Sequence, residues 1–372
     1  MRREPSIIIV GGGPAGSAAA IELRRRGVGR VTILDRSAYP RLKVCGSGLS
    51  PNALRELERL ELKDILAPLH IPMRGIVAVG PGGRSIELRG DHGAWIVPRT
   101  DFDHTLLREA GRLGAEIREK TRVRALLRDD NGRVRGVRTA DEELEADLVI
   151  CANGSPSQFE FDHSPRYGIR TIMGWWKGAT LPAPDQGIFA WSRQLDGYYA
   201  WAFPEPGGVV NVGLTIAERS AASHGIRPLF EEILEQEFSD VLRGAESMGP
   251  WKGHPATVTT RISSELVQPH CMWTGEAARL VSPGSVEGIG FALLSGRIAA
   301  ELCEEHFDPI RGFSSWHSQL YRSRLAVRML PKFLAGEAFV RLMRSRGTIR
   351  MLSRLADPKR MGQLAATVVG ER

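Results

Sequence analysis

The chain has 372 residues, of which 42% are hydrophobic and 25% are charged, as in ordinary globular proteins. This length predicts more than one packed unit, and no apolar run approaches the roughly 18 residues that a membrane span needs. The net charge of +7 is uneven, because residues 311–372 carry 13 Lys and Arg against 3 Asp and Glu, which leaves residues 1–310 mildly acidic.

The first 36 residues have the pattern of a strand, a helix and a second strand. Residues 6–10 form a β-branched apolar run that ends in glycines, which is typical of a buried parallel strand. Residues 14–26 follow with helical spacing and small alanines first, and residues 31–34 form the second run, ending at Asp35. Together they predict a βαβ unit of about 30 residues.

Later segments alternate between two kinds of pattern. Segments with helical or buried-strand patterns extend the nucleotide unit, and they comprise residues 51–66, 101–113, 121–128, 133–139, 147–152 and 270–302. Segments that alternate and are rich in aromatics predict an antiparallel sheet, and they comprise the hairpin 74–88 and most of residues 167–261. The basic stretch 313–355 is predicted to be helical.

The expected fold is therefore α/β with a second domain inserted into the first. Residues 1–73, 98–165 and 265–310 are predicted to form a discontinuous Rossmann-like domain. Residues 74–97 and 166–264 are predicted to form an inserted antiparallel-sheet domain that holds the substrate, and residues 311–372 a basic helical C-terminal segment.

The glycines after the first strand predict a dinucleotide site. Gly11, Gly13 and Gly16 fit the G-x-G-x-x-G pattern between a strand and a helix: the first permits the turn, the second lets the pyrophosphate approach, and the third lets helix and strand pack closely. The helix N-terminus attracts phosphate, and Asp35 can accept hydrogen bonds from ribose hydroxyls. NAD and FAD share this pattern, so it does not decide between them.

Further segments resemble FAD enzymes of the para-hydroxybenzoate hydroxylase type. They are Arg36, Pro98-Arg99, Asn153-Gly154 and the stretch from Gly275 to Gly290, although this family usually has Asp in place of Glu276 and of Asn153. The resemblance implies that the Rossmann-like domain binds FAD. The cofactor-binding residues expected from the glycine pattern and the resemblance are Gly11, Gly13, Pro14, Ala15, Gly16, Asp35, Arg36, Cys45, Gly46, Arg99, Gly275, Glu276, Gly288, Ile289 and Gly290.

Two segments resemble the geranylgeranyl reductase family in particular: residues 43–49 (KVCGSGL) and residues 197–204 (GYYAWAFP). The resemblance implies reduction of prenyl double bonds by hydride transfer from flavin N5, with the first segment near the flavin ring and the second lining the substrate cavity. Cys45, Tyr199 and Trp201 are the expected catalytic residues. The expected substrate pocket comprises Trp175, Trp191, Tyr199, Trp201 and Phe203.

Alternatives remain open for these residues. Cys45 is interpreted either as a proton donor, as a wall, or as an inert small side chain under the ring. Tyr199, Trp201 and Phe203 share one strand face, which also suits an ordinary core. The same strand resembles the W-x-W-x-I-P strand of flavin-dependent halogenases, which implies a monooxygenase or halogenase that modifies an aromatic or polyketide-like compound through a flavin C4a-hydroperoxide.

The remaining expectations concern partners and location. NAD(P)H or a reduced carrier is expected to supply the electrons. Because the sequence has a single G-x-G-x-x-G pattern, NAD(P)H would bind without a second nucleotide-binding domain in this chain. The basic C-terminal segment, with an amphipathic stretch at residues 325–339, suggests contact with an anionic membrane surface or an acidic carrier protein. No metal site or nucleic-acid partner is expected, and the short apolar run at residues 7–10 does not predict a signal peptide, so a cytoplasmic enzyme is expected.

Overall fold

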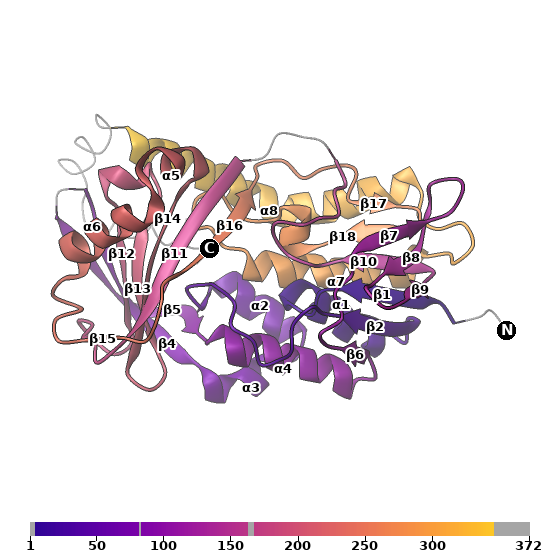
Figure 1. Cartoon of the computed structure of the whole chain (residues 1–372), viewed down its shortest axis with the longest axis horizontal. Helices are drawn as coiled ribbons and strands as arrows, with labels where there is room; N and C mark the ends of the chain where they lie inside the picture. Colours follow the sequence, from indigo (N-terminus) through magenta and orange to yellow (C-terminus); the bar gives the residue numbers. More distant parts are fainter. Residues whose placement is uncertain (1–3, 82, 163–166, 346–372) are drawn as a thin grey trace.

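A computed structural model describes residues 4–81, 83–162 and 167–345, and it has two large sheets side by side along its longest axis (Figure 1). The first sheet has six strands, and β17 alone runs antiparallel to its neighbour. In spatial order its strands are β17 (Val267–Gln268), β18 (Cys271–Trp273), β10 (Leu148–Cys151), β1 (Ser6–Val10), β2 (Arg30–Leu34) and β6 (Glu116–Arg118).

The βαβ unit predicted at the N-terminus is present as β1, α1 (Pro14–Arg25) and β2. Gly11 adopts a positive φ of 106°, which a side chain would disfavour, and a Cβ at Gly16 would overlap the Gly11 carbonyl oxygen. The helix therefore lies directly on the strand end. On its other side α1 packs on α4 (Arg99–Arg112) and α7 (Ile289–His306).

The second sheet has nine strands and curves around one end of the molecule (Figure 1). Its spatial order is β15 (Glu246–Ser247), β11 (Tyr167–Lys177), β14 (Val209–Ala217), β13 (Ala200–Glu205), β12 (Gln186–Ala190), β4 (Ile71–Val79), β5 (Ser85–Ile96) and β3 (Gly48–Leu49), with β16 (Lys252–Val258) also paired to β11. The predicted antiparallel arrangement is wrong at one place, because β12 and β4 are parallel. Between these two strands the chain contributes β6 and β10 to the first sheet, so β4 and β12 are not joined by a hairpin. Only strands joined by a hairpin have to be antiparallel.

Smaller elements surround the two sheets. A three-stranded sheet of β7 (Ala125–Arg128), β8 (Val134–Arg138) and β9 (Glu143–Glu145) packs through β8 on β10. Two helices, α5 (Glu218–His224) and α6 (Ile226–Phe238), pack against β11. The helical pattern predicted over residues 51–66 forms two helices, α2 (Pro51–Arg59) and α3 (Lys63–Leu66), because the chain turns at Glu61, whose φ is 51°.

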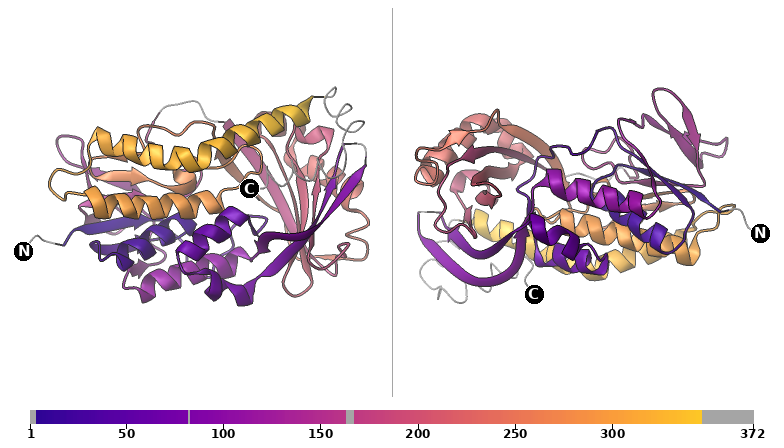
Figure 2. Two further views of the ribbon diagram at one scale, coloured as in Figure 1. Left: turned by 180° about the vertical axis from the view of Figure 1, so that it is seen from behind. Right: turned by 90° about the horizontal axis from the view of Figure 1, so that it is seen from below.

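The long helix α8 (Ser315–Arg344) runs along the molecule past both sheets (Figure 2). Its Met329 and Phe333 side chains are fully buried, and the Phe333 ring meets that of Phe291 in α7 edge to face. The interpretation of residues 325–339 as an amphipathic surface for a membrane or partner is therefore wrong for these side chains, which complete the core. Residues 346–372, which hold much of the predicted basic segment, lie outside the described residues.

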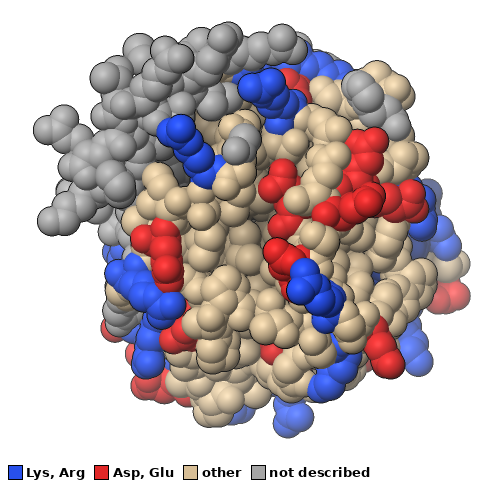
Figure 3. All heavy atoms as spheres, turned by 90° about the vertical axis from the view of Figure 1, so that its left-hand side faces the viewer, with Lys and Arg blue, Asp and Glu red and all other residues tan. Residues whose placement is uncertain are grey.

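Several charged side chains of α8 form ion pairs with other parts of the chain. Arg324 pairs with Glu305, and Arg344 pairs with Asp196. On the face at the nine-stranded sheet both signs of charge occur around a broad uncharged area (Figure 3). No helix within the described ranges is long and apolar enough to cross a membrane.

Candidate functional site

One cavity of about 390 Å³ extends from the glycine turn after β1 to the aromatic face of the nine-stranded sheet. Residues from distant segments line it together. The predicted site residues that line it are Gly11, Gly13, Pro14, Ala15, Asp35, Arg36, Cys45, Gly46, Arg99, Glu276, Gly288, Ile289, Gly290, Trp191, Tyr199, Trp201 and Phe203. Three predicted residues are not in this lining, namely Gly16, Gly275 and Trp175.

These three residues have other surroundings. Gly16 and Gly275 allow close packing, since a Cβ on Gly275 would lie 2.7 Å from the Cβ of Ala15. Trp175 shares the β11 face of Met173 but lies farther along the strand, where its side chain hydrogen-bonds Glu205. Trp175 therefore does not line this cavity, and its assignment to the substrate pocket stays a prediction.

The glycine turn leaves the N-terminus of α1 open to the cavity. Gly13 is the N-cap residue, Pro14 begins the helix, and the nearest atom to a Cβ on Gly13 would be Arg41 Nη2 at 3.6 Å. Asp35, at the end of β2, is held rigidly because its carboxylate accepts bonds from the backbone of Gly12 at 2.8 Å and from the Tyr39 hydroxyl at 3.1 Å. A phosphate at this turn would meet backbone N–H groups and no side-chain obstruction.

A second helix N-terminus opens onto the same cavity. Gly288 is the N-cap residue of α7, and Ile289 and Gly290 form its first turn. A Cβ on Gly290 would lie 2.5 Å from Glu287 Oε1 and 3.0 Å from the backbone nitrogen of Ala53, so a side chain there would displace the Glu287 carboxylate and press on α2. The partial positive charge of this terminus favours negative charge in the cavity.

Cations gather between the two helix ends. Arg36, Arg41, Lys43 and Arg99 all line the cavity. Arg99 forms a bidentate pair with the fully buried Asp103 at 2.7 and 2.8 Å, and Arg41 reaches the same carboxylate at 3.0 Å. The cavity thus offers two helix N-termini and a cationic wall as hydrogen-bond donors, and the Asp35 carboxylate as an acceptor. These groups fit the pyrophosphate, ribityl chain and ribose of FAD.

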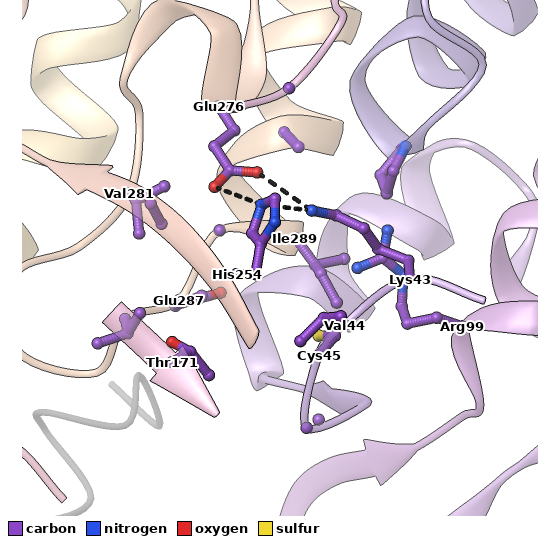
Figure 4. A pocket seen from close by; sticks show the side chains of 18 of the residues that line it. Lys43, Val44, Cys45, Arg99, Thr171, His254, Glu276, Val281, Glu287 and Ile289 are labelled. Carbon is purple, nitrogen blue, oxygen red and sulfur yellow. Dashed lines mark hydrogen bonds and ion pairs between the residues drawn. The ribbon is translucent and has the colours of Figure 1, made fainter. Parts of the chain in front are cut away.

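Cys45 lies between the cationic wall and the aromatic face. Its side chain is half-buried and lines the cavity close to Arg99, with which it interacts electrostatically (Figure 4). Lys43, two residues earlier in the chain, contacts His254.

The aromatic face is formed by three alternate residues, one just before β13 and two within it. Tyr199, Trp201 and Phe203 point to the same side, and Phe189 of β12 contacts the first and third of them. Trp201 lies across Gly213 of β14, where a Cβ would overlap the indole, and its Nε1 donates to Asn211 Oδ1 at 2.7 Å. The hydrogen bond and the absence of a side chain at Gly213 therefore favour this position of the ring.

The Tyr199 hydroxyl is already engaged, because it donates to the Ser285 carbonyl oxygen at 2.5 Å. Burial raises the pKa of this phenol, so it is neutral at physiological pH. It ties the aromatic face to the loop before α7. A role in shaping the cavity suits this geometry better than proton donation to a substrate.

Several lining residues were not predicted. Phe189, His254 and Glu287 line the cavity, and Asn211 supports it from behind. Alternation along residues 187–191 could have indicated Phe189, but His254 is isolated in the sequence and carries no spacing signal. Burial raises the pKa of Glu287, which accepts a hydrogen bond from Ser50 at the N-terminus of α2.

Comparisons with known proteins relate the chain to FAD-binding proteins and reductases. Residues 4–175 match a protein family described as an FAD binding domain. A menaquinone reductase from Mycobacterium tuberculosis is 31% identical over 322 residues, covering 80% of this chain and 76% of that protein. A geranylgeranyl diphosphate reductase from Rhodobacter capsulatus is 27% identical over 309 residues, covering 79% and 73%.

Solved structures show the same fold at low identity. A geranylgeranyl bacteriochlorophyll reductase-like protein from Thermoplasma acidophilum has a TM-score of 0.78 and 21% identity, with 97% of this chain and 99% of that chain covered. The flavin-dependent brominase Bmp2 has a TM-score of 0.77 and 18% identity, with 99% and 93% covered.

Proposed function

Because the chain belongs to the geranylgeranyl reductase family of FAD-dependent oxidoreductases, we propose that it reduces a carbon–carbon double bond in the prenyl part of an apolar substrate. The observation that carries this proposal is a continuous cavity whose polar end fits FAD and whose other end is an aromatic wall. Reduced FAD, when bound, supplies the hydride. Two relatives are named for menaquinone and for geranylgeranyl diphosphate, and both of these compounds contain a prenyl chain.

The chain's own residues orient the substrate and supply a proton. The aromatic rings of Tyr199, Trp201 and Phe203 exclude water and favour an apolar chain. The Cys45 thiol is the proposed proton donor to the second carbon of the double bond, and solvent returns the proton afterwards. Its neighbour Arg99 would stabilise the thiolate that is left.

The electron donor in this proposal is NAD(P)H or a reduced carrier. The chain has one G-x-G-x-x-G pattern, and this pattern forms the turn assigned to FAD. A nicotinamide donor would therefore bind transiently, without a nucleotide-binding domain of its own.

The proposal is tested under anaerobic conditions. FAD-loaded enzyme with excess dithionite is given geranylgeranyl diphosphate, which has no quinone ring for dithionite to reduce, and the product is analysed by mass spectrometry. We expect a gain of two hydrogens per reduced double bond. Cys45→Ala should lower turnover at least about tenfold with FAD retained, whereas Cys303→Ala, at a buried thiol away from the cavity, should keep the wild-type turnover per bound FAD.

A monooxygenase or halogenase is the second candidate, because the Tyr199 and Trp201 face also suits an aromatic substrate. Substrate-coupled oxygen uptake, with no anaerobic product, would favour it over reduction.

We also propose that the basic C-terminal segment contacts an anionic membrane surface. The support is its excess of 13 Lys and Arg over 3 Asp and Glu in residues 311–372. Sedimentation with phosphatidylglycerol vesicles should be strong at low salt and weak at high salt. Absence of binding at low salt would contradict the proposal, and salt-sensitive binding to an acidic carrier protein instead would replace it.

A further inference from the structure

Three polar side chains meet across the cavity between its polar and aromatic ends. Lys43 Nζ lies 2.7 Å from His254 Nε2, and each of these nitrogens lies 3.9 Å from an oxygen of Glu276 (Figure 4). All three residues line the cavity, with side chains that are 22–23% exposed. They are close enough to act as one unit.

These side chains come from three separate parts of the fold. Lys43 belongs to the loop between β2 and β3, and Glu276 to the 3-10 turn Gly275–Ala278 after β18. His254 belongs to β16 of the nine-stranded sheet. The contact therefore joins the sheet that carries the aromatic wall to the side of the cavity that fits FAD.

Charge and burial define how the contact works. Burial lowers the pKa of His254 to about 4, and the nearby Lys43, Arg36 and Arg99 act in the same direction. The imidazole is therefore neutral at pH 7, and its Nε2 accepts a hydrogen bond from the Lys43 ammonium. Burial lowers the pKa of Lys43 while Glu276 opposes this effect, so the histidine orients the cation without adding charge.

Lys43 differs from the neighbouring cations in what it contacts. Arg41 and Arg99 are fixed on Asp103 at 3.0 and 2.7 Å, whereas the Glu276 carboxylate is 3.9 Å from Lys43. The Lys43 ammonium can thus serve an anionic or hydroxyl-bearing ligand in the cavity, provided that it is held in place. Its close hydrogen bond to His254 holds it.

We infer that His254 is a positioning residue of the cofactor site, which holds Lys43 toward the ribityl and pyrophosphate chain of FAD. The sheet that carries the aromatic wall thereby contributes to cofactor affinity. The inference rests on FAD as the cofactor, which the proposed function also requires, but it is independent of the substrate.

Two variants of similar polarity test the inference. The amide of His254→Gln can occupy the position of Nε2 and accept the Lys43 bond, whereas the shorter amide of His254→Asn cannot reach it. FAD affinity of the apoprotein is measured by quenching of flavin fluorescence. H254N should weaken FAD binding about tenfold and H254Q by less than about twofold.

Double variants separate positioning from a merely structural role. Because His254 acts through Lys43, K43M/H254N should bind FAD about as weakly as K43M alone. The apoprotein unfolding midpoint should be the same for H254N and H254Q, and His104→Asn, at a half-buried histidine of α4 outside the cavity, should bind FAD like the wild type.

Equal affinity of H254N and wild type, equal weakening by H254N and H254Q, or additive losses in the double variant would each overturn the inference. Wild-type enzyme that binds FAD tightly but reduces no prenyl substrate would contradict only the proposed function.

Discussion

Asn211 determines where the Trp201 ring lies in the cavity wall. It is fully buried, accepts the indole N–H at 2.7 Å and donates to the Gly174 carbonyl at 3.3 Å. Asn211→Leu leaves the indole donor without a partner, so we expect a loss of about 1–3 kcal/mol in the free energy of unfolding. Urea unfolding measures this change.

The same substitution should also impair substrate reduction more than FAD binding, because Asn211 supports the aromatic wall and not the cationic end. Asn131→Leu, at an exposed turn, is the control and should change neither quantity. Wild-type stability in the N211L variant would show that the hydrogen bond does not hold the ring.

A pH effect follows from His254. Its folded-state pKa is about 4 against an ordinary value of 6.5, so on acidification the unfolded chain takes up the proton first. The stability linked to this residue is therefore complete above pH 6.5 and is lost as the pH falls toward 4, by up to about 3 kcal/mol. H254Q lacks the titrating group and should lose less stability than the wild type between pH 7 and 4.5.

Urea unfolding at a series of pH values measures the difference. Other acidic groups such as Glu276 are present in both proteins and largely cancel in the comparison. Parallel stability curves for the two proteins would contradict the assignment.

Residue-level prediction from sequence succeeded where a local pattern existed. Alternation indicated the shared face of Tyr199, Trp201 and Phe203, and the glycine pattern indicated the turn at Gly11. His254 had no such signal, because its partner Lys43 is 211 positions away and only the sheet packing brings them together.

Two glycines of the βαβ unit have different roles: Gly16 allows the helix to pack on the strand, and Gly13 leaves space for a phosphate. Two variants distinguish these roles. A Cβ at Gly16 would overlap the Gly11 carbonyl, so Gly16→Ala should destabilise the apoprotein by about 2 kcal/mol or more. A Cβ at Gly13 has space in the protein but would enter the path of the phosphate. Gly13→Ala should therefore keep apoprotein stability and weaken FAD binding about tenfold or more.

Thermal unfolding without FAD, together with FAD titration, checks the pair. Loss of stability in G13A, or normal stability in G16A, would contradict the roles given to these positions.

The helix α8 offers a test of its place in the core. Alanine normally favours a helix by about 1 kcal/mol over glycine. A Cβ at Gly336, however, would lie 2.7 Å from the Gly284 backbone nitrogen. Gly284 belongs to the loop whose Ser285 carbonyl accepts the hydrogen bond from the Tyr199 hydroxyl. Gly336→Ala should thus lower stability in urea unfolding, and a more stable variant would show that the loop yields freely.

Helices and strands could be predicted from the sequence where the spacing of their apolar residues matched the face that is buried. The runs that form β1, β2 and β10 are buried strands, and the leucines of residues 51–66 do face the core. The break at Glu61 and the burial of Met329 were not predictable, because a turn conformation and the partner of an apolar face depend on tertiary packing.

At the scale of the whole molecule, the cavity lies where two sheets built from interleaved segments meet. The α/β class with a Rossmann-like FAD-binding unit is confirmed. The division into domains at residues 73, 97, 165, 264 and 310 stays a prediction. Sequence patterns indicated both ends of the cavity, but its continuity depends on how the sheets pack, for which no local pattern exists.

The central claim is that bound FAD passes its hydride directly to a prenyl substrate in this cavity. An anaerobic single-turnover experiment tests it most directly: the bound FAD is reduced by light, geranylgeranyl diphosphate is added, and the flavin absorbance is followed. We predict that the flavin is reoxidised without oxygen and that one double bond is saturated per flavin. A flavin that stays reduced until oxygen is admitted, followed by an oxygenated or halogenated product, would contradict the account.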